Sequence, residues 1–133
     1  MYNIVLAEDD ESSRSNIQEL LMMKGYNTEC ASEGLAALEM IQASMPDLII
    51  TDITMPGLDG FELLEILRAN PETACLPVIF LSSRVEYQDI EKGLKCGANA
   101  YITKPFKALC LLSAIEECLE RQALLKQDLS NNS

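Results

Sequence analysis

The sequence predicts an α/β fold in which helices cover both faces of a doubly wound, five-stranded parallel sheet. Short apolar runs, three of them continuous, alternate five times with segments of helical periodicity along the 133 residues. Continuous apolar runs are typical of strands buried on both faces. Regular alternation of strand and helix indicates parallel strands joined by right-handed crossovers. A chain of this length makes one such domain.

The strands are assigned from their apolar patterns. Residues 4–7, 48–50 and 78–81 are continuous apolar runs, which indicate interior strands. Residues 27–31 and 100–103 are more mixed, which suits the two edges of a sheet. With the second and fifth strands at the edges, the predicted order is 2-1-3-4-5. The order reverses direction between the first and third strands, and we expect a ligand site there.

The five helices follow from apolar residues at helical spacing and from the glycine or proline that ends most of the patterns. The first three patterns end at Gly25, before Pro46 and before Pro71. The fourth, from about Gln88 to Cys96, is polar and ends at Gly97. The apolar positions of the other four are, in order, Ile17, Leu20 and Leu21; Leu38 and Ile41; Phe61, Leu64 and Leu67; and Leu112, Ile115 and Leu119.

The fifth helix is expected to continue past the sheet. Its core face ends near Leu119, but good helix formers continue through "RQALLKQDL". Leu124, Leu125 and Leu129 have no evident place against the sheet. Unburied leucines at a helix end indicate a contact outside the domain.

This pattern predicts a domain at residues 1–122 followed by a helical extension and polar tail at residues 123–133. We expect the helix to run to about Lys126 and residues 130–133 to be disordered. No DNA-binding or enzymatic output domain fits after residue 120, so the chain is expected to be either a standalone regulator or an excised module.

Composition excludes several classes of protein. Lys and Arg number 10 against 21 Asp and Glu, and the net charge of −11 argues against direct binding of nucleic acid or an anionic membrane. Five cysteines without a C-x-x-C pair predict reduced thiols rather than disulfides or a zinc site. No apolar run approaches the roughly 18 residues of a membrane helix, so we expect no membrane insertion and a cytoplasmic protein.

Charged and polar side chains follow the predicted strands at the edge where the order reverses. Asp52 ends the third strand, and the acidic run at residues 8–10 ends the first. Carboxylates placed together repel unless something neutralises them, and a divalent cation such as Mg²⁺ suits them. Ser82 and Lys104, at the ends of the fourth and fifth strands, could supply a hydroxyl and a cation to a phosphoryl group.

At this point the chain resembles the receiver domain of two-component response regulators. Four blocks carry the resemblance, each at the end of a predicted strand: "EDD", "DITMPGLDG", "FLSS" and "YITKPF". They cover residues 2 to about 120. The departures are Glu8 in place of the commoner Asp and Ser82 in place of Thr, both frequent variants in that family.

The resemblance implies that Asp52 is the phosphoacceptor, which attacks a phosphohistidine on a partner kinase. It also implies a Mg²⁺ site made by Asp9 directly, by Glu8 through water, and by Asp52 with the backbone carbonyl of Thr54. A cis peptide before Pro105 would aim the preceding lysine into the site.

The same resemblance implies roles in the switch for the remaining residues. Ser82 would donate to the phosphoryl group, Lys104 would pair with it, and Tyr101 would change rotamer with the switch. Thr54 and Arg84 occupy positions that tune the phosphoryl lifetime in the family.

The implied protein is a regulatory phosphoacceptor that slowly hydrolyses its own acyl phosphate rather than a turnover enzyme. Its expected partners are a histidine kinase or phosphotransfer protein, a downstream output protein or domain, and a second copy in a phosphorylation-dependent homodimer. The surface of the fourth helix, fifth strand and fifth helix would make the output contact.

Other classes of protein fit the residues less well. A flavodoxin-like electron carrier shares the flavodoxin-like strand order, but "EDDESS" would repel a cofactor phosphate. A haloacid dehalogenase phosphatase needs a second Asp where Thr54 stands. An EF-hand would put Met55 at its first ligand position. A receiver that no longer accepts phosphate and only docks to a partner is the last alternative.

Each candidate also has an ordinary structural interpretation. Asp52 could start a turn, and Asp9 or Asp10 could cap the first helix. Lys104 could be an exposed lysine before a turn, and Tyr101 an edge-strand packing residue. The four blocks together favour the functional interpretation, except for Asp10, which we expect to be the helix cap.

Overall fold

The computed structural model describes residues 1–131, with side chains to residue 126. The predicted sheet is confirmed: five parallel strands lie in the order β2-β1-β3-β4-β5. The strands are β1 (Asn3–Ala7), β2 (Asn27–Ala31), β3 (Leu48–Thr51), β4 (Val78–Ser82) and β5 (Ala100–Thr103). The helices between and after them are α1 (Glu11–Met23), α2 (Gly34–Ala43), α3 (Gly60–Ala69), α4 (Tyr87–Lys95) and α5 (Ala108–Asn131).

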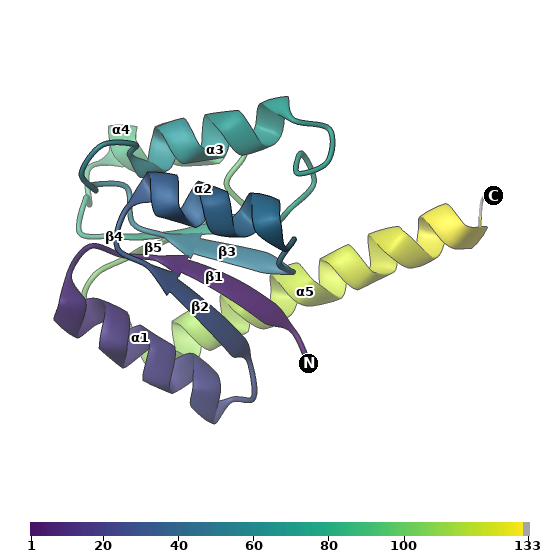
Figure 1. Ribbon diagram of the computed structural model, residues 1–133, viewed down its shortest axis with the longest axis horizontal. Coiled ribbons are helices and arrows are strands. Elements are labelled where there is room, and N and C mark those ends of the chain that lie inside the picture. Colours follow the sequence, from purple (N-terminus) through teal and green to yellow (C-terminus); the bar gives the residue numbers. More distant parts are fainter. Residues whose placement is uncertain (132–133) are drawn as a thin grey trace.

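The helices form two layers, with α1 and α5 on one face of the sheet and α2, α3 and α4 on the other (Figure 1). Alternate residues of each interior strand pack against the two helix layers in turn. Ile4 and Leu6 of β1 pack with α1 and α5, whereas Val5 and Ala7 pack with α2 and α3. A strand covered on both faces needs apolar side chains at every position, which explains the continuous apolar runs.

Local sequence signals start the helices beside the acidic edge of the sheet. Asp10 caps α1, as predicted, by accepting a hydrogen bond from the backbone N–H of Ser13 at 2.9 Å. Asp59 caps α3 and forms a capping box with Glu62. Gly60 begins α3 because a Cβ at that position would collide with the backbone carbonyl of Asp52. These features hold the loops after β1 and β3 close to the sheet.

The structure of α5 differs from the sequence prediction in two details. Leu111, which was not among the predicted apolar positions, is fully buried, whereas the predicted Leu112 is partly buried against the same core. The helix also continues to Asn131, beyond the predicted end near Lys126 and through two residues expected to be disordered. Neither glycine nor proline interrupts the helix after Pro105. Asn132 and Ser133 lie outside the described residues.

The extension of α5 projects from the edge of the sheet where the strands begin, away from the carboxyl ends of the strands (Figure 1). Its predicted exposed leucines are exposed: Leu124 by 61% and Leu125 by 50%. The side chain of Leu129 lies outside the described part.

The five cysteines are free thiols, in agreement with the sequence prediction. Within residues 1–131, none of the helices combines the length and the apolar character needed to cross a bilayer.

Candidate functional site

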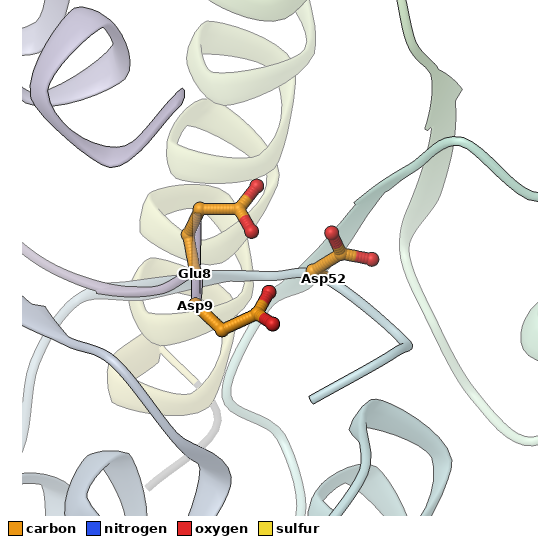
Figure 2. A group of neighbouring side chains, drawn as sticks. All are labelled: Glu8, Asp9 and Asp52. Atoms are coloured by element: carbon orange, nitrogen blue, oxygen red, sulfur yellow. The ribbon is translucent and has the colours of Figure 1, made fainter. Parts of the chain in front are cut away.

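Three carboxylates meet where β1 and β3 end. The two strands pair in parallel with Ala7 opposite Thr51, so the residues that follow them, Glu8 and Asp52, leave the sheet side by side. Asp9 continues the turn after β1. One carboxylate oxygen from each of the three residues lies within 4.8 Å of the other two. Figure 2 shows the three side chains grouped at this edge.

The three acids differ in burial. Glu8 is 2% exposed and Asp52 is 8% exposed, whereas Asp9 is open to solvent. The Oδ1 atom of Asp52 accepts hydrogen bonds from the backbone N–H groups of Ile53 at 2.6 Å and Thr54 at 3.3 Å. These bonds leave the other carboxylate oxygen of Asp52 facing the group of acids and their partner lysine.

Lys104, just after β5, provides the positive charge of the site. Its Nζ donates to Oε1 of Glu8 and, at 3.0 Å, to Oδ2 of Asp52. The Lys104–Pro105 peptide is cis, in agreement with the expectation from the resemblance. The backbone N–H of Lys104 donates to the carbonyl of Ser82 at 2.8 Å, which fixes the lysine beside the end of β4.

Burial and charge act in opposite directions on these ionisable groups. Burial raises the pKa of Glu8, although the hydrogen bond from Lys104 opposes this effect. Burial alone would lower the pKa of Lys104, but the hydrogen bonds to Glu8 and Asp52, with their charges, outweigh it and raise the pKa. The ammonium is therefore strongly retained in its charged form.

The donor set suits a hard divalent cation. Three carboxylates share one ammonium, which leaves a formal charge of about −2 at the site. Carboxylate oxygens are the ligands that Mg²⁺ and Ca²⁺ prefer. Both oxygens of Glu8 already accept hydrogen bonds, one from Lys104 and one from the backbone N–H of Asp10 at 3.3 Å, whereas Asp9 is free of Lys104. Asp9 is accordingly the carboxylate of the three that is most available to a cation.

Ser82, Thr54 and Tyr101 lie on the β4 and β5 side of the site. Ser82 is fully buried at the end of β4, and its Oγ accepts from the backbone N–H of Arg84 at 3.2 Å. The Tyr101 hydroxyl donates to the Arg84 carbonyl at 2.8 Å. Its ring meets Phe80 edge to face at 6.0 Å. Burial raises the pKa of Tyr101. The backbone of Arg84 therefore joins Ser82 to Tyr101, and the side-chain Nε of Arg84 donates to Oγ1 of Thr54 at 3.0 Å.

Two further residues contact the site, and no feature of the sequence pointed to either of them. Arg14 of α1 donates from Nη1 to the carbonyl of Glu8 at 2.9 Å and so fixes the acidic turn. Asp89, in the first turn of α4, lies 3.7 Å from Nη1 of Arg84. Each side chain reaches across a loop to a residue five or six positions away, and this spacing belongs to no recognisable motif.

Comparison with known proteins is consistent with this geometry. Residues 4–116 match the family model described as the response regulator receiver domain. The chain is 39% identical over 132 residues to the probable transcriptional regulator ycf29 of Porphyra purpurea, covering 99% of this chain and 63% of that protein. The chain thus spans less than two thirds of the length of this curated relative.

Solved structures show the same likeness. A response regulator receiver domain protein from Clostridium thermocellum superposes with a TM-score of 0.87 at 28% identity, covering 94% of this chain and 99% of that one. The receiver domain of the sensor histidine kinase PA1611 from Pseudomonas aeruginosa PAO1 has a TM-score of 0.83 at 28% identity, covering 90% and 98%. That structure has a magnesium ion coordinated in its active site cleft.

Proposed function

Because this chain belongs to the family of response regulator receiver domains, we propose that it is a switch in which Asp52 accepts a phosphoryl group. The donor would be a phosphohistidine on a histidine kinase or a phosphotransfer protein. The observation that carries the proposal is the position of Lys104, whose Nζ lies 3.0 Å from Oδ2 of the buried Asp52 within a group of three acids. An ammonium at that place is suited to a phosphoryl oxygen.

In the proposed reaction, a carboxylate oxygen of Asp52 attacks the phosphorus, the bond from phosphorus to the histidine nitrogen breaks, and an acyl phosphate forms. Lys104 then pairs with a phosphoryl oxygen, and the Ser82 hydroxyl donates to another. Water later attacks the phosphorus, the bond from phosphorus to the Asp52 oxygen breaks, and phosphate leaves with the carboxylate restored. Because this hydrolysis is slow, the protein acts as a regulator rather than as a turnover enzyme. Glu8, through water, and Asp9 help to hold the site's cation.

Mg²⁺ is the proposed cation, held by Asp9, Asp52 and the backbone carbonyl of Thr54, with Glu8 acting through water. When bound, it would offset the negative charge on the carboxylates and on the phosphoryl oxygens. Support comes from the donor set and from the excess of negative charge that Lys104 leaves uncompensated.

Intact-mass measurement after incubation with Mg²⁺ and acetyl phosphate tests the proposal. The parent should gain one phosphoryl group, and Asp52→Asn should gain none, since an amide oxygen is too weak a nucleophile. Glu19→Gln, which removes an exposed acid of α1 away from the site, is the matched control and should be labelled like the parent. Equal labelling of Asp52→Asn would reject Asp52 as the acceptor.

We also propose that α4, β5 and α5 form the output surface, with Tyr101 moving as Asp52 becomes phosphorylated. Partners would be a downstream output protein or domain, or a second copy of the chain. We place this switch in the cytoplasm, where the kinase domain of a two-component system meets its receiver.

The extension of α5, residues 123–133 beyond a domain of residues 1–122, is the proposed site of association. Gln122 is a natural boundary because its Nε2 donates to the Cys75 carbonyl at 2.8 Å. Past it, Leu124 and Leu125 are exposed. Sedimentation of the parent, of a truncation after Gln122, and of Leu124→Gln/Leu125→Gln, each with and without beryllofluoride and Mg²⁺, tests this. If the parent stays monomeric in both states, the extension is not a self-association element.

A further inference from the structure

Arg84 lies between the acidic site and α4. Its Nε donates to Oγ1 of Thr54 at 3.0 Å, and Thr54 in turn donates its backbone N–H to Oδ1 of Asp52 at 3.3 Å. Its Nη1 lies 3.7 Å from Oδ1 of Asp89 in the first turn of α4. One side chain therefore touches a neighbour of the phosphoacceptor and the beginning of a helix.

The contact with Asp89 is weak. The two side chains are 40% and 28% exposed, and an ion pair of this kind at 3.7 Å contributes little in water. By contrast, a phosphoryl group carries about −1.5 to −2 charges and three acceptor oxygens, and the planar guanidinium can bind two of them at once. A phosphoryl group on Asp52 would therefore compete well with Asp89 for Arg84.

We propose that Arg84 is a phosphoryl-binding residue that exchanges Asp89 for the phosphoryl group when Asp52 is modified. The inference rests on the proposed function, because it requires a phosphoryl group at Asp52. The exchange supplies a second protein cation to the phosphoryl oxygens beside Lys104. It also frees Asp89, so that the same movement changes how α4 is held.

The structure makes α4 responsive to such a release. Gly93 is the only buried residue of α4, and it rests against the rings of Phe80 and Tyr101. The hydroxyl of Tyr101 donates to the backbone carbonyl of Arg84. A shift of Arg84 therefore alters both the first turn of α4 and the hydrogen bond of the aromatic residue beneath that helix.

A double-mutant cycle on Arg84 and Asp89, read as affinity for beryllofluoride in saturating Mg²⁺ by calorimetry, tests the exchange. Arg84→Gln should weaken binding about tenfold, since it removes a charge-assisted hydrogen bond. Arg84→Lys, which keeps the charge but not the planar fork, should weaken it less. Asp89→Asn should tighten binding about two- to fivefold, because it removes the competing anion.

The double variant distinguishes exchange from general electrostatics. If Asp89 acts through Arg84, the variant with both Arg84→Gln and Asp89→Asn should bind like Arg84→Gln alone. Equal tightening by Asp89→Asn in both backgrounds, or no effect of Arg84→Gln, would overturn the inference while leaving Asp52 as the acceptor. Failure of the parent to bind beryllofluoride would instead overturn the proposed function itself. Unchanged circular dichroism and urea midpoints establish that each variant is folded.

Discussion

Replacing Asp9 by asparagine tests whether the acidic site is a cation site. Asp9 is the exposed member of the group, and Lys104 bonds to Glu8 and Asp52 rather than to it. The substitution therefore removes one negative charge and leaves the ammonium hydrogen bonds in place. Asparagine also keeps the size of the side chain, so the turn after β1 should be preserved.

Coulomb's law sets the size of the effect in the protein without metal. Two carboxylate oxygens 4.8 Å apart repel by about 1 kcal/mol in water and by about 3.5 kcal/mol at an effective dielectric constant of 20. Because Asp9 is exposed, the lower value applies. Asp9→Asn should thus be as stable as the parent or more stable, by up to about 1 kcal/mol.

Magnesium should make the parent more stable than Asp9→Asn. A cation that binds only the folded state at ten times its dissociation constant adds roughly 1.4 kcal/mol to the free energy of unfolding. For a domain of this size that corresponds to an increase in melting temperature of about 5 °C. Asp9→Asn should lose most of this increase, because a direct ligand is missing.

Thermal unfolding followed by circular dichroism, with Mg²⁺ and with EDTA, measures both effects. Glu19→Gln removes a charge of the same sign from α1 and should behave like the parent in both solutions. If Asp9→Asn gains as much stability from Mg²⁺ as the parent does, Asp9 is not a ligand. A variant that is markedly less stable than the parent in EDTA would contradict the repulsion argument.

Other measurements test features away from the site. Arg68 donates at 2.8 Å to the carbonyls of Leu76 and Gly97, so Arg68→Met should lower the free energy of unfolding by about 2 kcal/mol, and a urea midpoint close to the parent value would contradict this. Cys118 is buried, and burial raises its thiol pKa, so at pH 8 it should react with iodoacetamide at least tenfold more slowly than the exposed Cys110. Mass mapping of the alkylated peptides measures the two alkylation rates, and equal rates would contradict this prediction.

The sequence alone was sufficient for the architecture and for the location of the site. Strands buried on both faces need continuous apolar runs, and residues 48–50 and 78–81 meet that need without help from distant segments. Once the strand order is inferred, parallel strands must end at one edge, so Asp52 and the acids after β1 had to lie near each other. These conclusions depend on local pattern and on topology.

The partners of the side chains were decided only by the tertiary structure. The hydrogen bond from Lys104 to Glu8 joins residues 96 positions apart, and the contact of Arg84 with Thr54 joins residues 30 apart. Such contacts depend on the exact positions and directions of the loops, which no periodicity in the sequence encodes. For the same reason the full burial of Leu111 was missed, although Leu112, Ile115 and Leu119 do pack against the core, since the surface against which a helix packs decides how it is turned on its axis.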